Sequence, residues 1–201
     1  MLHFLSLLDP FQKYLLAINI VAFVLYTIDF WFYQFTGNEL ISHLFLDVLT
    51  VIGGVVGTLL AFFIWDRKTV KDNAWWHVFA VAFFIIWCAI IGFVYLSPFN
   101  PKAFFQNLIS RHIIPSIYLV AINTVTLVYF GIDKMRAMEG KWRIREVSLL
   151  GMCLAGGSIG GLIGMSAFRH KIRSPHFRYG LPLLLAAQLF LMIYLINAGL
   201  V

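Results

Sequence analysis

Charged side chains are scarce in this chain: they make up 12% of its 201 residues, against 61% for hydrophobic residues. Soluble domains carry roughly 25% charged residues, so an ordinary soluble fold is excluded. Acidic residues are fewer than basic ones: nine Asp and Glu stand against fifteen Lys and Arg, which gives a net charge of +6. Because the bases lie mainly in short connections between apolar runs, this balance reflects membrane topology, and we expect no nucleic-acid partner.

Cysteine is also nearly absent. Cys88 and Cys153 both lie inside apolar runs, where we expect small buried hydrophobes and predict neither a disulfide nor a metal site. The chain has no Ser-His-Asp grouping, no phosphate-binding glycine loop that ends in Gly-Lys-Ser/Thr, and no paired-carboxylate motif. The sequence therefore specifies no reaction and no cofactor, and it leaves open whether the protein is an enzyme.

Long apolar runs, by contrast, are abundant. Six of them reach about 20 residues, enough to cross about 30 Å of hydrocarbon as an α-helix. They predict an all-α membrane protein with six transmembrane helices. Asp9 and Pro10 stand where a signal peptide would have its apolar core, so we expect the first run to remain as an anchor. The six runs are Tyr14–Phe32, His43–Ile64, His77–Leu96, Ile113–Ile132, Val147–Phe168 and Leu181–Leu200.

The chain contains an internal duplication. Tyr14–Asp29 aligns without a gap with Tyr118–Asp133, and the matches include the polar pair Asn19 and Asn123 and the closing aspartates. Shared apolar composition does not produce polar matches, so the pattern indicates a repeat. It predicts two tandem three-helix repeats, residues 1–112 and 113–201. Three crossings per repeat would give the second copy inverted topology, an arrangement found in many secondary transporters.

The distribution of Lys and Arg predicts which face is cytoplasmic. With six crossings, nine of these bases fall on the side of the N-terminus and six on the other, so the N-terminus is predicted to be cytoplasmic. Four of the six opposing bases belong to residues 169–178, which runs against the charge rule. Either that stretch is kept outside because it functions there, or Val147–Phe168 is a broken or re-entrant helix that does not cross.

Glycines recur at helical spacing in both repeats. Small residues four apart let two membrane helices approach closely, so we expect these glycines to pack helices together, within the chain or between protomers of a homo-oligomer. The glycines with this predicted role are Gly53, Gly57, Gly156, Gly160 and Gly164.

Asp133 ends the fourth apolar run near the bilayer boundary. A carboxylate there should face protein, water or a cation, and the expected partner is a nearby base such as Lys134, Arg136 or Arg143. The alternative is a carboxylate that binds a proton or a cation. Asn123 lies deeper in the same run and predicts an interhelical hydrogen bond.

The sharpest chemical feature is a basic cluster among aromatic residues, made of Arg169, His170, Lys171, Arg173, His176 and Arg178. Arg offers a fork for phosphate or carboxylate oxygens, Lys a point charge, and His a proton donor. The cluster predicts an anion-binding site for an anionic lipid head group or solute, with transport or flipping as the accompanying activity. Generic head-group contact is the simpler alternative. The flanking cations oppose a divalent metal ion at the histidines.

Two further alternatives remain open. One is a membrane enzyme acting on a lipid head group, with His170 as acid or base and Asp133 or Glu146 as its partner. The other is a structural or partner-binding subunit. Glu146 begins the fifth apolar run, where it could cap that helix, or pair with a base of the cluster if the intervening segment folds back.

The spaced motifs of the second half resemble a bacterial family of small membrane proteins of unknown function, some of which carry an N-terminal cold-shock domain. The resemblance covers about residues 115–195. It implies a bacterial inner-membrane protein and no particular activity. The residues that carry it are Tyr129, Asp133, Lys134, Arg136, Ala137, Gly140, Lys141, Trp142, Arg143, Ile144, Glu146, Gly156, Gly157, Ser158, Gly160, Gly164, Met165, Phe168, Arg169, His170, Lys171 and Phe177.

Overall fold

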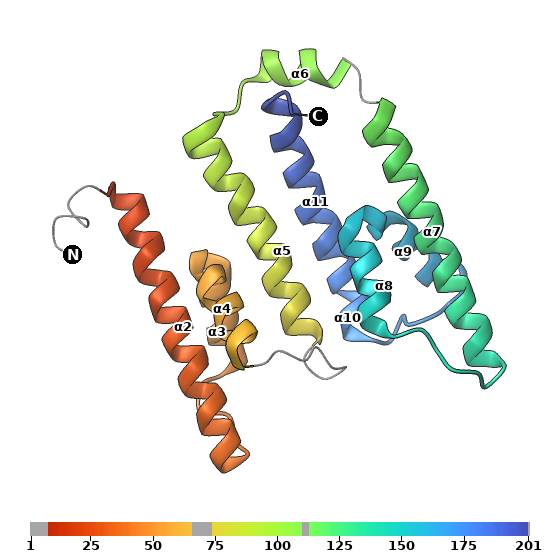
Figure 1. Cartoon of the computed structure of the whole chain (residues 1–201), viewed down its shortest axis with the longest axis horizontal. Coiled ribbons are helices and arrows are strands. Elements are labelled where there is room, and N and C mark those ends of the chain that lie inside the picture. The colour runs from red at the N-terminus through yellow and green to blue at the C-terminus, as the bar shows by residue number, and fades with distance from the viewer. Residues whose placement is uncertain (1–7, 66–73, 110–112, 201) are drawn as a thin grey trace. The chain divides into compact units, whose positions relative to one another are not determined.

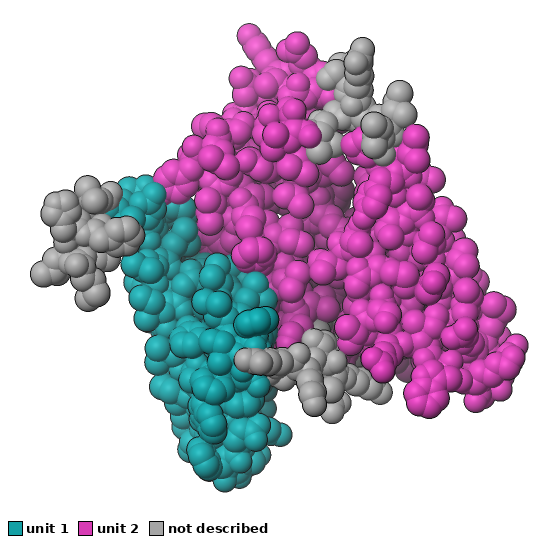
Figure 2. All heavy atoms as spheres, viewed as in Figure 1, with its two compact units in different colours: residues 1–69 teal, residues 70–201 magenta. Residues whose placement is uncertain are grey.

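The structure is a computed structural model that describes residues 8–65, 74–109 and 113–200, and its regular elements in these ranges are all helical. Six helices are long and apolar enough to span a membrane, which confirms the predicted all-helical, multi-pass class. The chain forms two compact units, residues 1–69 and 70–201 (Figure 2). The repeat boundary at residue 112 stays a prediction, as does the side of the membrane on which the N-terminus lies.

The first unit begins with a capped helix. Helix α2 (Pro10–Thr36) starts with Pro10 in its first turn, and the side chain of Asp9 accepts a hydrogen bond from the backbone N–H of Gln12 at 2.7 Å. The Gln12 side chain accepts one in return from the N–H of Asp9, which completes a capping box. Helices α3 (His43–Leu49), η1 (Thr50–Gly54) and α4 (Val55–Trp65) follow. The sequence repeat also aligns residues 66–68 with residues 169–171, but 66–68 lie outside the described residues.

The segment from α3 to α4 doubles back along α2. At one end, the N–H groups of Leu40 and Ile41 donate to Oδ1 of Asp29 at 3.0 and 2.9 Å. At the other end, the indole of Trp65 donates to Thr27 at 3.2 Å. The middle of the segment lies near the far end of α2, because the Tyr14 hydroxyl donates to a carbonyl of η1 at 2.5 Å. The direction changes at Gly53, which breaks the helix with a φ of 124°.

The second unit is built on the long helices α5 (Ala74–Ile91), α7 (Ile113–Met138) and α11 (Gly180–Asn197), which Figure 1 shows. Helix α5 leads through η2 into the short α6, and α7 runs back to a broken segment, α8, η3 and α9. The short α10 precedes the last long helix, α11. The bounds are α5 Ala74–Ile91, η2 Gly92–Leu96, α6 Pro101–Ile109, α7 Ile113–Met138, α8 Glu146–Met152, η3 Cys153–Gly157, α9 Ser158–Ala167, α10 Pro175–Arg178 and α11 Gly180–Asn197.

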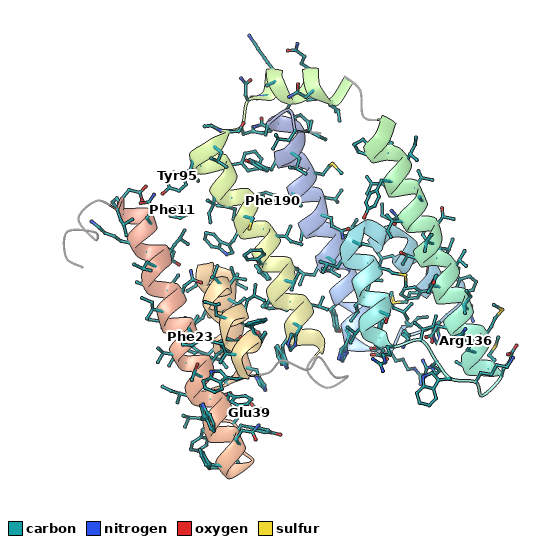
Figure 3. All side chains as sticks on the ribbon, in the orientation of Figure 1. Phe11, Phe23, Glu39, Tyr95, Arg136 and Phe190 are labelled. Carbon is teal, nitrogen blue, oxygen red and sulfur yellow. The ribbon has the colours of Figure 1, made fainter. Side chains whose placement is uncertain are left out.

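Helices α5 and α11 lie side by side and run in the same direction (Figure 1). In the first half of each helix, Ala82 of α5 and Leu181 of α11 belong to one hydrophobic core. Near their ends, the ring of Phe93 contacts those of Phe190 and Tyr194, with centroids 6.0 and 5.1 Å apart; Phe190 is labelled in Figure 3. The contacts therefore advance together along both helices, as parallel packing requires.

Residues 146–167 form a second doubled-back segment. As one straight helix these 22 residues would reach about 33 Å. Instead Asp133 contacts the chain on both sides of the segment, at Ile144 and at His170. The helix breaks at Gly156, with a φ of 116°. The segment is therefore a broken helix, one of the two alternatives that the sequence left open. The inverted repeat arrangement, which needed three crossings per half, is not confirmed.

The same capping contacts secure the break in both units. Asn123 donates to the carbonyl of Gly156 at 3.0 Å and accepts from the N–H of Gly160 at 2.7 Å. In the first unit Asn19 makes both contacts at 2.9 and 2.8 Å, with Gly53 and Gly57. These bonds satisfy backbone groups that a broken helix exposes away from water. Asn19 and Asn123, which match in the sequence repeat, therefore have the same structural role.

Candidate functional site

The basic cluster begins in a tight turn after α9. The N–H of His170 donates to the carbonyl of Met165 at 3.1 Å, and the turn places Arg169 and Lys171 at positive φ angles of 45° and 59°. Such angles are uncommon for residues other than glycine and persist only where surrounding contacts hold them. The side chains of the adjacent residues His170 and Lys171 point inward, and Arg169 and Arg173 are exposed.

Asp133 lies at the centre of the contacts that the inward-facing side chains make. Its side chain is fully buried near the end of α7. Oδ1 accepts the N–H of Ile144 at 2.9 Å, and Oδ2 lies 2.7 Å from Nε2 of His170. Oδ2 also lies 3.7 Å from a guanidinium nitrogen of Arg143, whose side chain is half exposed. Of the three bases expected as partners of Asp133, the structure places Arg143 against it.

Lys171 connects the two carboxylates. Its ammonium group lies 2.9 Å from Oε1 of Glu146 and 3.6 Å from Oδ2 of Asp133, and its side chain is 4% exposed. The same group lies 5.2 Å from the ring centroid of the buried Phe177, a cation–π geometry. Glu146 therefore pairs with a base of the cluster because the intervening segment folds back, one of the two roles expected for it. We call Asp133, Glu146, His170 and Lys171 the buried ion cluster.

The three arginines of the basic cluster point outward. Arg169, Arg173 and Arg178 are exposed, and the guanidinium of Arg178 lies 5.5 Å from the ring centroid of Tyr179. His176 is half buried. The six predicted anion-binding residues thus divide into an inward pair, His170 and Lys171, that faces carboxylates, three exposed arginines, and the half-buried His176. Within the described ranges, the His, Cys, Asp and Glu side chains form no group of three or more that could hold a metal ion.

The remaining predicted residues lie elsewhere. Asn123 caps the helix break and takes no part in the buried ion cluster. Among the described residues Lys134 forms no ion pair with Asp133. Gln188 of α11 was not predicted from the sequence. Its side chain donates to the carbonyls of Cys153 and Leu154 at 2.7 and 3.0 Å. The signal in the sequence is a polar side chain inside an apolar run, which predicts a hydrogen-bond partner within the protein.

The long apolar helices indicate a multi-pass membrane protein. Sequence comparisons identify its family. The family described as protein of unknown function (DUF1294) matches residues 123–177, the stretch from the Asn123 cap to Phe177. The uncharacterized protein YsdA of Bacillus subtilis (strain 168) is 43% identical over 74 residues, which cover 37% of this chain and 83% of that protein. The chain belongs to the DUF1294 family. No solved structure matches it.

Replacing Lys171 with methionine should lower the free energy of unfolding by roughly 3 kcal/mol. The change removes a buried cation and leaves Glu146 and Asp133 close together without it. Arg173→Met is the matched control, because Arg173 is exposed and the same change should stay within about 0.5 kcal/mol. Unfolding of both variants in detergent, followed by tryptophan fluorescence, measures the difference. Equal losses would show that Lys171 is not structurally distinct from its neighbour.

Proposed function

We propose that the second unit binds an anionic group, a phosphate or a carboxylate, on the outward face of residues 169–178. The observation that supports this is the division of the basic cluster. His170 and Lys171 are held against buried carboxylates, and the resulting turn presents Arg169 and Arg173 to the outside. A turn held in place by buried contacts is a preorganised site, because little backbone freedom is lost on binding.

The chemistry of the outward group suits an oxyanion. Arginine presents several N–H donors in a planar fork, which matches two oxygens of a phosphate or carboxylate. Among the described residues Arg169 and Arg173 form no ion pair, so their charge is not neutralised within the unit. The buried ion cluster beneath them contains as many acidic as basic side chains. The positive potential of this surface therefore comes from the exposed arginines.

The test is a double variant, Arg169→Ala with Arg173→Ala. Wild-type protein in a neutral detergent should gain thermal stability when phosphatidylglycerol or inorganic phosphate is added, because a ligand that binds the folded state stabilises it by mass action. The double variant should lose most of that gain and should purify with less bound anionic lipid. Lys102→Ala, at an exposed base of α6, is the control and should behave like wild type. An unchanged anion response in the double variant would refute the proposal.

The proposal is for binding, without transport or catalysis. Transport was expected from inverted repeats, and the parallel course of α5 and α11 does not supply that support. For catalysis, His170 and Asp133 do lie within hydrogen-bond reach of each other. However, His170 is 8% exposed and Asp133 is fully buried, so this pair has no visible access to a substrate.

A further inference from the structure

We infer that the exposed basic surface of the second unit faces the lipid head groups of the cytoplasmic leaflet, and that residues 146–167 enter and leave the membrane on that one side. The inference rests on the proposed function in one respect, namely that the ligand is an anion. It adds the side of the membrane and the source of the anion. Three independent features of the unit support it: the direction of its helices, the distribution of its bases and the side chains around them.

The direction of the helices fixes the number of crossings within the unit. The ends of α5 and α11 meet, because the Asn197 side chain contacts Ser97, Pro98 and Asn100 with hydrogen bonds of 2.8–3.2 Å. Between these ends the chain passes along α7 and then through residues 146–167. If that segment crossed the membrane, α11 would run antiparallel to α5. The two helices are parallel, so the segment returns to the side from which it started (Figure 1).

This course brings both basic connections to the same end of the unit. The sequence has five Lys and Arg in residues 134–145 and four in residues 169–178. Asp133 contacts both connections, through Ile144 and His170. At the opposite end, the described part of the unit carries one base, Lys102. Because Lys and Arg accumulate in cytoplasmic loops, the Asp133 end is cytoplasmic. The bases at 169–178, which opposed the charge rule under six crossings, now obey it.

The side chains between these bases favour lipid over a soluble anion. Trp142 is 88% exposed and Tyr179 is 56% exposed, and the apolar Ile172 is 43% exposed between two bases. Tryptophan and tyrosine concentrate at the level of membrane head groups, where one part of the ring is apolar and another is wet. A small soluble anion would use the arginines alone. Anionic phospholipid uses both kinds of side chain, and the cytoplasmic leaflet supplies a negative surface.

Cysteine labelling tests the side of the membrane. Three single variants, Trp142→Cys, Ile172→Cys and Phe105→Cys, are made in a Cys88→Ser background; the buried Cys153 remains, and the background protein is the blank. A membrane-impermeant maleimide should label position 105 on α6 in intact cells. It should label positions 142 and 172 only in inside-out vesicles. Labelling of 142 and 172 from opposite sides, or of both from outside, overturns the inference.

Nanodiscs test the source of the anion. The protein should melt at a higher temperature in discs that contain phosphatidylglycerol than in discs of phosphatidylcholine alone, and Arg169→Ala with Arg173→Ala should remove the difference. If inorganic phosphate in phosphatidylcholine discs gives the whole shift and phosphatidylglycerol gives none, the ligand is a soluble anion: the lipid assignment fails and the proposed function survives. If neither arm gives a shift, the proposed function itself fails, whatever the labelling shows.

Discussion

Replacing Asp133 with alanine should destabilise the second unit by about 3–5 kcal/mol, the range observed when one partner of a buried ion pair is removed. Two groups lose their hydrogen-bond acceptor at once, the ring of His170 and the N–H of Ile144. Lys171 loses one of its two carboxylate partners and keeps Glu146. Water compensates His170 and Lys171 poorly, because they are 8% and 4% exposed. The turn at residues 169–171, with its two positive φ angles, should lose the contacts that hold it.

The measurement is equilibrium unfolding in detergent, with limited proteolysis at residues 168–174 as a local reading. Glu139→Ala is the matched control, because Glu139 is an acid near the same end of α7 whose ion pair with Lys141 is exposed on both sides. Exposed pairs contribute between zero and about 1 kcal/mol, so this variant should remain close to wild type. If both variants lost the same stability, the buried ion cluster would have no special role in the fold.

Replacing Gly160 with alanine should be nearly as damaging, at about 3 kcal/mol or more. A Cβ atom at this position would lie 2.0 Å from the backbone carbonyl oxygen of Asn123, far inside any allowed contact. The obstacle is backbone, so α7 and α9 would have to move apart, and overpacking of this kind ordinarily costs about 1–3 kcal/mol even where side chains can yield. The displacement would also break the hydrogen bond from Gly160 to Asn123.

A second glycine of the same segment provides the control. A Cβ atom on Gly151 of α8 would meet nothing within 4 Å. Alanine is a better helix former than glycine by about 1 kcal/mol, so Gly151→Ala should leave stability unchanged or raise it slightly. Thermal melts of the two variants therefore should move in opposite directions or differ by several degrees. A small effect at Gly160 would mean that α7 and α9 are not as closely packed as the structure shows.

Several features of the second unit could be predicted from the sequence because they depend on covalent spacing and charge. Four of the six apolar runs correspond to the long helices α2, α5, α7 and α11. An acid at the end of an apolar run had to find a base, and Arg143 contacts Asp133. The pairing of Glu146 with the cluster was expected on the condition that the segment folds back, and Lys171 supplies the base.

Other features could not be predicted because they depend on backbone direction. The same glycine spacing suits a straight helix packed against a neighbour and a helix that breaks, and only the φ of Gly156 separates the two. The division of the basic cluster into inward and outward side chains lies in a turn with positive φ angles at Arg169 and Lys171, which are not glycines. The sequence therefore predicted one binding site made of six bases, whereas two of them, His170 and Lys171, contact buried carboxylates.

The contacts of Asn197 also set an order of assembly. Its side chain bonds to residues about one hundred positions earlier, at Ser97, Pro98 and Asn100. The ribosome releases α5 long before it makes α11, so these bonds cannot form until synthesis is nearly complete. The contacts around Asp133, by comparison, join residues at most 38 positions apart. The ion cluster can therefore close first during synthesis, and α5, made early, is the helix that is fixed last.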